Sequence, residues 1–131
     1  MDVKDRLLVN LADLEKAKTR LEEVLRQERN DFMRDSTVQR FEFGFELAWK
    51  TGKLFLEFLG KVGVNSPREV ILELAGNEVM KDTEKWLDFL EFRNWCAHMY
   101  GEERLGEVYG MAENLVVEVG KEVGAIEERI K

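Results

Sequence analysis

The sequence predicts an all-α protein, an antiparallel up-and-down bundle of four long helices and one short helix. Apolar residues recur every three or four positions over long stretches, and helix-forming Glu, Lys, Leu and Val are abundant. The chain also contains a single proline. The connections between the expected helices are short, which favours antiparallel neighbours. The 131 residues suit a single domain spanning residues 1–131.

The first long helix is expected over about residues 4–29, with Asn30 and Asp31 ending it. Its leucines keep a spacing of three, four and seven, which is typical of a narrow seam in a bundle. The residues of this seam are Leu7, Leu11, Leu14, Leu21 and Leu25.

A second helix is expected to open at Ser36, which forms a capping box with Gln39, and to stop at Gly60. One apolar face contains Val38, Phe41, Phe45, Ala48, Phe55 and Leu59, and a second contains Phe43, Leu47 and Phe58. Two apolar faces predict a further partner, either another copy or another protein. Gly44 and Gly52 each cost a helix roughly 1 kcal/mol relative to alanine. Close approach of another backbone or of a ligand would explain them, and chance tolerance is the alternative.

A short helix follows, with Ser66 as N-cap, Pro67 in the first turn, Glu69 completing a capping box, and Gly76 at its end. The last helix is expected from about residue 103 to residue 130, where apolar residues again follow a heptad-like order.

The segment W-L-D-F-L-E-F-R-N-W-C-A-H-M-Y, residues 86–100, is expected to be a helix capped by Asp82 or Thr83 and ending near Gly101. Helical spacing places on one inner face Trp86, Leu90, Arg93, Ala97 and Tyr100. Burying a guanidinium is costly unless it is paired or faces a wet cleft, so Arg93 indicates a site. Asn94 and His98, four residues apart, lie on the flank of this face.

These residues suit metal-independent ribonuclease chemistry. His98 can take or give a proton near neutral pH, and Arg93 can hold a phosphate as charge builds in the transition state. Asn94 could orient either group, and Tyr100 could donate a hydrogen bond or be modified. Taken alone, however, the pattern favours a structural role, with Arg93 paired to a core glutamate such as Glu42 or Glu46.

Composition limits the other function classes. The formal net charge of −7 at pH 7 argues against broad nucleic-acid binding, so RNA contact would need a local basic patch. The candidates on the second helix are Arg34, Arg40, Lys50 and Lys53. Each is at least as well explained as a solvated surface charge.

Cys96 is the only cysteine and is most simply a core thiol. Together with a single histidine, it leaves no pattern for a metal site, and no cofactor is expected. No apolar run approaches the length of a membrane span, and the charged N-terminus does not look like a secretion signal. The expected location is the cytoplasm.

Three motifs in order resemble the nucleotidyltransferase substrate-binding protein family of the HEPN superfamily, which is similar to the HepT toxins. They are R-D-S-T-V-Q-R-F-E-F-G-F-E-L-A-W-K-T from residue 34, S-P-R-E-V from residue 66, and the segment 86–100. The resemblance covers about residues 34–109 and implies a helical bundle that dimerises and works with a separately encoded minimal nucleotidyltransferase.

In that family the R-x-x-x-x-H motif falls on Arg93 and His98, with Asn94 as the polar residue after the arginine. Tyr100 completes the longer toxin form, and the resemblance implies that the nucleotidyltransferase places AMP on it to silence the toxin. The sequence departs from the family pattern at Trp95, Cys96 and Met99, which are larger or less polar than expected.

Two functions remain open. The first is an RNA-cleaving toxin in which a dimer joins two copies of the motif and adenylylation of Tyr100 blocks the cleft. The second is a non-catalytic subunit that presents a nucleotide, a substrate or Tyr100 to the nucleotidyltransferase. The acidic net charge leans toward the second function. A purely structural dimeric bundle leaves Arg93, Asn94 and His98 unexplained. If a dimer forms, its interface is expected to use Phe43, Leu47 and Trp95.

Overall fold

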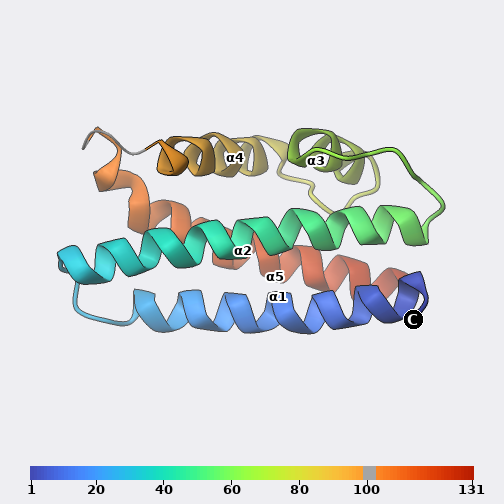
Figure 1. Cartoon of the computed structure of the whole chain (residues 1–131), viewed down its shortest axis with the longest axis horizontal. Coiled ribbons are helices and arrows are strands. Elements are labelled where there is room, and N and C mark those ends of the chain that lie inside the picture. The colour runs from blue at the N-terminus through green and yellow to red at the C-terminus, as the bar shows by residue number, and fades with distance from the viewer. Residues whose placement is uncertain (99–102) are drawn as a thin grey trace.

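The computed structural model describes residues 1–98 and 103–131, and within them the chain is helical (Figure 1). The five α-helices are α1 (Val3–Leu25), α2 (Asp31–Phe58), α3 (Pro67–Gly76), α4 (Thr83–Ala97) and α5 (Val108–Arg129). A single 3-10 turn, Leu105–Glu107, leads into α5. The predicted all-α bundle is confirmed.

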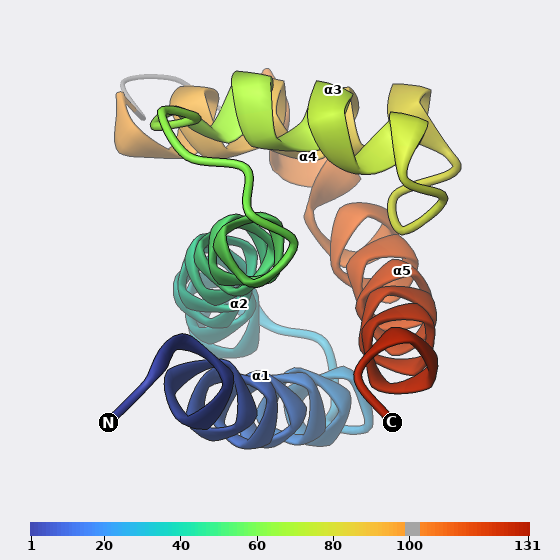
Figure 2. The ribbon, with the colours of Figure 1, turned by 90° about the vertical axis from the view of Figure 1, so that its right-hand side faces the viewer.

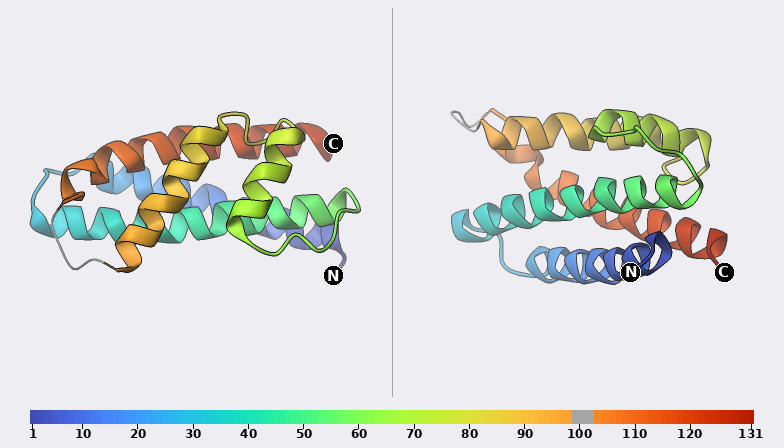
Figure 3. Two further views of the ribbon diagram at one scale, coloured as in Figure 1. Left: turned by 90° about the horizontal axis from the view of Figure 1, so that it is seen from above. Right: turned by 45° about the vertical axis from the view of Figure 1, so that its right-hand side comes forward.

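Three long helices form the body of the bundle. Figure 2 shows α1, α2 and α5 in cross-section, with α3 and α4 as a layer above α2 and α5. Viewed from above, α4 crosses α2 obliquely rather than running alongside it (Figure 3). The C-terminal end of α4 therefore overhangs one exposed side of α2, and this overhang carries the candidate site.

The helix starts follow from local side-chain caps. Asp2 and Asp5 form a capping box at the start of α1, and the Ser66 side chain accepts a hydrogen bond from the backbone N–H of Glu69 at 3.3 Å. The predicted start of the second helix at Ser36 is wrong. Asn30 caps α2, because its Oδ1 accepts the backbone N–H of Met33 at 2.8 Å, so Asn30 begins this helix instead of ending α1.

An aromatic cluster joins α4 to α2. Phe41 of α2 packs edge-on against Phe92 and Phe89 of α4, with ring centroids 5.2 Å and 6.1 Å apart. Such edge-to-face pairs add roughly 0.5–1.5 kcal/mol beyond the burial of their surface. This cluster fixes α4 on α2 and so determines which α4 side chains reach the surface of α2.

Gly52 permits the close approach of α3 to α2. A β-carbon at this position would collide with Leu74 Cδ1 and lie 3.2 Å from Val70 Cγ1, both in the core. A close approach therefore does occur at Gly52, but side chains of α3 make it and not the expected backbone or ligand. At Gly44 the nearest atom to such a carbon, Leu115 Cδ2, lies at an ordinary 3.5 Å.

We expect Gly52→Ala to destabilise the protein by about 1–3 kcal/mol, because overpacking the core forces Leu74 and Val70 to move. Gly44→Ala is the matched control, and we expect it to be neutral or to stabilise by up to roughly 1 kcal/mol through helix propensity. Urea unfolding of both variants measures the difference. Equal stabilities of the two variants would contradict the close packing at Gly52.

The end of α4 and the start of α5 differ from the positions predicted from the sequence. The helix expected over residues 86–100 ends at Ala97, and its predicted end at Gly101 lies outside the described residues. The last helix begins at Val108, after the 3-10 turn, rather than near residue 103. No helix within residues 1–98 and 103–131 is long and apolar enough to cross a membrane.

Candidate functional site

The buried face of α4 is rotated from the predicted one. The structure buries Trp86, Phe89, Phe92 and Cys96. Ala97, which was expected on the inner face, is exposed, and the expectation for Ala97 is therefore wrong. The reason is that Phe89 and Phe92 remove much more apolar area from water than Leu90 and Ala97 would. The Arg93 side chain consequently lies at the rim of the core, 25% exposed.

Arg93 is held by two neighbours on the rim. Its Nη1 donates to Glu46 Oε2 on α2 at 2.9 Å, and its Nε donates to Asn94 Oδ1 at 3.2 Å. Its guanidinium carbon lies 5.7 Å from the centroid of the Phe45 ring. Of the two glutamates considered as partners, Glu46 is the one that pairs with Arg93. Three contacts thus hold the guanidinium in one orientation.

Glu46 lies between two cations. Besides Arg93, it pairs with Lys50 Nζ at 3.5 Å, one helical turn along α2. Two positive charges therefore share one carboxylate, which leaves the trio of Arg93, Glu46 and Lys50 with a net positive charge. On the preceding turn, burial raises the pKa of the Glu42 carboxyl above its ordinary value, and the charge of Arg93 partly opposes that rise.

His98 is the C-cap of α4 and is exposed. Its backbone N–H donates to the carbonyl oxygen of Trp95 at 3.0 Å, so the residue leaves the helix just after the turn that carries Arg93 and Asn94. The exposed imidazole is accessible to a substrate or to a second chain. Tyr100, the expected modification site, lies outside the described residues, as does Met99.

Arg104 is a residue of this region that the sequence analysis missed. Its Nη1 lies 3.1 Å from Glu91 Oε1 on α4, and its Nε lies 2.9 Å from Glu107 Oε2. The hydrogen bonds to Glu107 raise the pKa of Arg104 above its ordinary value. The guanidinium carbon of Arg104 lies 5.2 Å from the centroid of the Phe92 ring. Arg104 thereby ties the start of the last helical region to α4 close to the motif.

Cys96 is buried on the inner face of α4, 7% exposed, as expected for a core thiol. Burial raises its pKa to about 12, with a further contribution from the charge of Glu42 that Arg104 partly offsets. A thiol with so high a pKa is a poor nucleophile at neutral pH.

The four basic residues predicted to contact RNA do not form one patch. Arg34 pairs with acidic neighbours on its own helix. Arg40 turns toward α1, where its Nη1 donates to the Arg20 carbonyl oxygen and lies 3.9 Å from a Glu23 oxygen. Lys50 and Lys53 instead line a groove between α1 and α2. Of the four, only these two lysines extend from the Arg93 region along the surface of α2.

Comparison with known proteins supports this fold. A family model described as "Nucleotidyltransferase substrate binding protein like" matches residues 9–123. A curated protein of Haemophilus influenzae named "Probable ribonuclease HepT" is 26% identical over 85 residues, which cover 62% of this chain and 58% of that protein.

A crystal structure of a Thermus thermophilus protein superposes with a TM-score of 0.78 at 24% sequence identity, covering 86% of this chain and 98% of that one. At this identity the likeness supports the fold. The family match covers α2, α3 and α4 in full and most of α1 and α5, including the described residues of the candidate site. The chain therefore belongs to the family of nucleotidyltransferase substrate-binding-like proteins.

Proposed function

We propose that this chain is the helical component of a two-protein system with a minimal nucleotidyltransferase and that it acts as a metal-independent ribonuclease. The observation that carries the proposal is the fixed guanidinium of Arg93, one helical turn before an exposed histidine, His98. A ribonuclease of this kind needs a cation at the scissile phosphate and a group that moves protons near neutral pH. The curated relative's name, "Probable ribonuclease HepT", and the family description support both halves of the proposal.

In the proposed reaction, His98 takes the proton of a ribose 2′-hydroxyl, whose oxygen attacks the neighbouring phosphorus. The bond from phosphorus to the 5′-oxygen breaks, the leaving oxygen receives a proton from water, and His98 returns its proton to the solvent. Arg93 neutralises the charge that builds on the non-bridging oxygens, while Asn94 and Glu46 act as positioning residues that hold its guanidinium. The products are a 2′,3′-cyclic phosphate and a 5′-hydroxyl.

Regulation is proposed to act on Tyr100. The partner nucleotidyltransferase would join the phenol oxygen to the α-phosphorus of ATP, break the α–β phosphoanhydride bond and release pyrophosphate and the phenol proton. The AMP group adds bulk and negative charge two residues from His98, which excludes the RNA phosphate.

The purified, unmodified chain is therefore expected to cut single-stranded RNA in the presence of EDTA and to leave cyclic phosphate ends. Incubation with the nucleotidyltransferase and ATP is expected to add AMP to the intact mass and to stop cleavage. Tyr100→Phe is the matched control, because it should stay unmodified and active. Folded, unmodified protein that cuts no RNA would contradict the proposal.

A second function, a non-catalytic nucleotide- or substrate-binding subunit, is favoured by one observation. Arg93 is already paired with Glu46, and a carboxylate in that place competes with a phosphodiester for the guanidinium. This alternative predicts a stable complex with the nucleotidyltransferase and nucleotide binding that requires Arg93, without RNA cleavage.

We also propose that the chain forms a homodimer through the exposed side of α2 near its N-terminal half. Phe43 is 58% exposed there, and Leu47 is partly buried beside it. Trp95 stacks on Phe92 and is only partly exposed. It therefore offers less surface to the interface than a fully exposed tryptophan would. Sedimentation at micromolar concentration is expected to give a dimer for the wild type and a monomer for Phe43→Asp. A wild-type monomer would contradict this proposal.

A further inference from the structure

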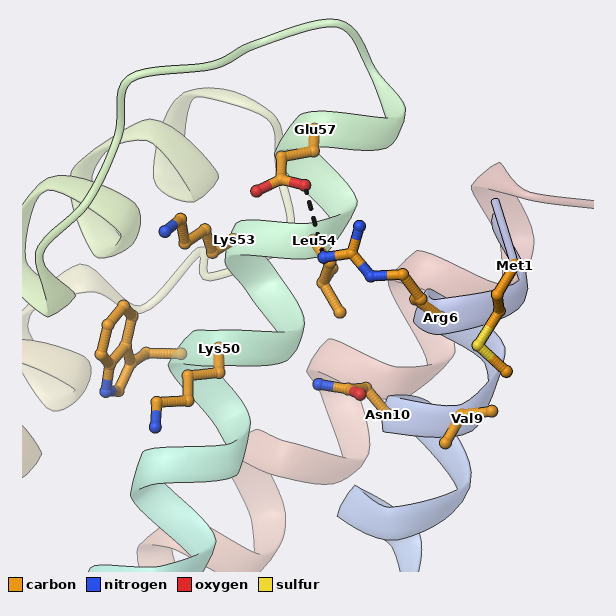
Figure 4. A pocket seen from close by; sticks show the side chains of 9 residues that line it. Met1, Arg6, Val9, Asn10, Lys50, Lys53, Leu54 and Glu57 are labelled. Atoms are coloured by element: carbon orange, nitrogen blue, oxygen red, sulfur yellow. Dashed lines mark ion pairs between the residues drawn. The ribbon is translucent and has the colours of Figure 1, made fainter. Parts of the chain in front are cut away.

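The groove between α1 and α2 gathers positive charge on a strongly acidic protein. It encloses about 480 Å³. Figure 4 shows Arg6 and Asn10 extending from α1 toward α2, where Glu57 meets Arg6, whereas the side chains of Lys50 and Lys53 leave α2 on the side away from α1. The groove thus holds three cations and one carboxylate, whereas the whole chain carries a net charge of −7.

The cations of the α1–α2 groove are only loosely paired. Arg6 Nη2 lies 3.9 Å from Glu57 Oε2, beyond hydrogen-bond distance, and the Arg6 side chain is 49% exposed. Lys53 has no ion pair with any residue in the ranges 1–98 and 103–131. Cations held this loosely keep most of their capacity to bind an anion from solution.

The groove is continuous with the Arg93 site along one stripe of α2. Residues 46, 50, 53 and 57 follow a spacing of four, three and four, so their side chains share one face of the helix. At one end of the stripe Glu46 pairs with Arg93 of α4, and at the other end Glu57 faces Arg6 of α1. The stripe spans about 16 Å at a helical rise of 1.5 Å per residue.

Apolar side chains form the walls of the groove. Leu54 is 8% exposed, Trp49 is 9% exposed, and Val9 is 46% exposed. Asn10 adds an amide that can donate or accept a hydrogen bond. Phosphate-binding cations beside apolar surface and an amide form the combination that single-stranded nucleic acid requires, with charge for the backbone and surface for the bases.

We infer that the α1–α2 groove binds the single-stranded RNA that flanks the bond cut at Arg93 and His98. Arg6, Lys50 and Lys53 bind successive phosphates, and the strand runs along the exposed stripe of α2. A stripe of about 16 Å accommodates about five stacked nucleotides at roughly 3.4 Å each. The inference rests on the proposed ribonuclease function, because it names where that enzyme holds its substrate.

The positive charge of this groove explains how a protein with an acidic composition can still bind RNA. Phosphate binding depends on the local field, which Lys50 and Lys53 on the stripe and Arg6 on the facing helix provide, although the chain as a whole carries a net charge of −7. A protein with such a groove repels RNA from its other faces. The strand is therefore directed along α2 toward Arg93 rather than bound at random.

The test uses the full chain with His98→Ala, so that RNA is bound without being cut. Arg6→Ala/Lys53→Ala removes two groove cations and leaves untouched the Glu46 pairs with Arg93 and Lys50. The matched control, Lys16→Ala/Arg20→Ala, removes one lysine and one arginine from exposed positions of α1 outside the groove. Fluorescence anisotropy of a labelled RNA of about twelve nucleotides, long enough to cover the stripe, is measured over a range of salt concentrations.

We expect the groove variant to bind RNA about tenfold to a hundredfold more weakly than the control in roughly 50 mM salt. Its slope of log K against log salt should be smaller by about 1.4, or roughly 0.7 for each lost phosphate contact to a single strand. Arg6→Lys/Lys53→Arg keeps both charges and should retain binding, which separates charge from disturbed folding. Equal affinities and slopes for the groove and control variants would overturn the inference.

Other outcomes are also decisive. ATP binding that depends on Arg6 and Lys53, without RNA binding, would overturn the inference and assign the groove to a small nucleotide. Charge-dependent RNA binding by a wild-type protein that cuts no RNA would support the groove and remove the ribonuclease. RNA cleavage by the wild type, together with undiminished RNA binding by the groove variant, would support the ribonuclease function and overturn the inference about the groove.

Discussion

Replacing Arg93 or His98 with alanine is expected to lower RNA cleavage by about 10²–10⁴-fold. His98→Ala removes the proton-transfer group, and Arg93→Ala removes the cation that stabilises the developing charge on phosphate. His98 is exposed and Arg93 lies at the rim, so neither change leaves a cavity in the core. The measurement is kcat/KM on a labelled RNA, with circular dichroism to establish that each variant is folded.

Two further variants make this result specific. Arg93→Lys keeps the charge but loses the planar fork that contacts both Glu46 and Asn94, so we expect only partial activity. Arg29→Ala removes an exposed arginine that pairs with Glu113, outside the site, and should keep wild-type activity. Cleavage by folded His98→Ala at the wild-type rate would show that the activity comes from another group or from a contaminant.

The second large effect concerns Glu122, a carboxyl buried in the core of the bundle. Its side chain is 0% exposed, and neither carboxylate oxygen has a hydrogen-bond partner within the described parts of the chain. Burial raises the pKa of Glu122 well above its ordinary value, because a charge there has no solvent and no counter-ion. The native state therefore holds a proton that the unfolded chain releases above about pH 4.3.

Stability should consequently fall as the pH rises above the ordinary glutamate pKa, until the raised native pKa is reached. One proton bound more tightly by the native state gives a slope of at most about 1.4 kcal/mol per pH unit. Glu122→Gln cannot ionise, so its stability relative to the wild type should increase with pH. Urea unfolding between about pH 5 and pH 9, a range that begins just above the ordinary glutamate pKa, measures this difference.

Glu127→Gln provides the control, because it removes one formal charge from an exposed position of the same helix. A stability difference between Glu122→Gln and the wild type that stays constant over this pH range would show that Glu122 is not buried in its protonated form. Glu118 offers a contrast within α5, because it is buried but pairs with Lys85 at 3.8 Å and Lys121 at 3.2 Å. Replacing Glu118 would break two ion pairs, whereas Glu122→Gln replaces a buried carboxyl that has no partner among the described residues.

Local signals in the sequence predicted the parts of the fold that depend on few residues. Ser66 and Pro67 identify the start of α3 because the N-cap and the first-turn proline are adjacent, and the Ser66 side chain does accept the backbone N–H of Glu69. Asn30 was misread as a helix end because it is also a common residue after a helix. Only the hydrogen bond from Met33 shows that it begins α2.

The candidate site was predicted in part, because its residues come from different helices. The sequence placed Arg93 on the inner face of its helix and named Glu42 and Glu46 as partners, but the structure places Arg93 at the rim, and the crossing of α4 over α2 selects Glu46. Helical spacing alone gave the wrong inner face for α4, since it did not weigh the large areas of Phe89 and Phe92.

Other contacts had no sequence signal. Arg104 reaches Glu91 across residues that separate two helices, and only its pair with Glu107 follows a local spacing. Arg6 lines the same groove as Lys50 and Lys53 because α1 and α2 run antiparallel in one particular register. Such a register depends on the packing of whole helices rather than on a motif.

The position of the two termini determines how the protein should be immobilised or labelled. Both termini lie at the same end of the bundle, whereas the C-terminal end of α4 projects beyond the side of α2 in the other half of the bundle (Figure 3). A linker at residue 131 leaves His98 accessible. A linker at residue 1 begins at the α1–α2 groove, which Met1 helps to line, and covers part of the proposed RNA-binding surface. An N-terminal affinity tag is therefore expected to weaken RNA binding, whereas a C-terminal tag leaves both surfaces open.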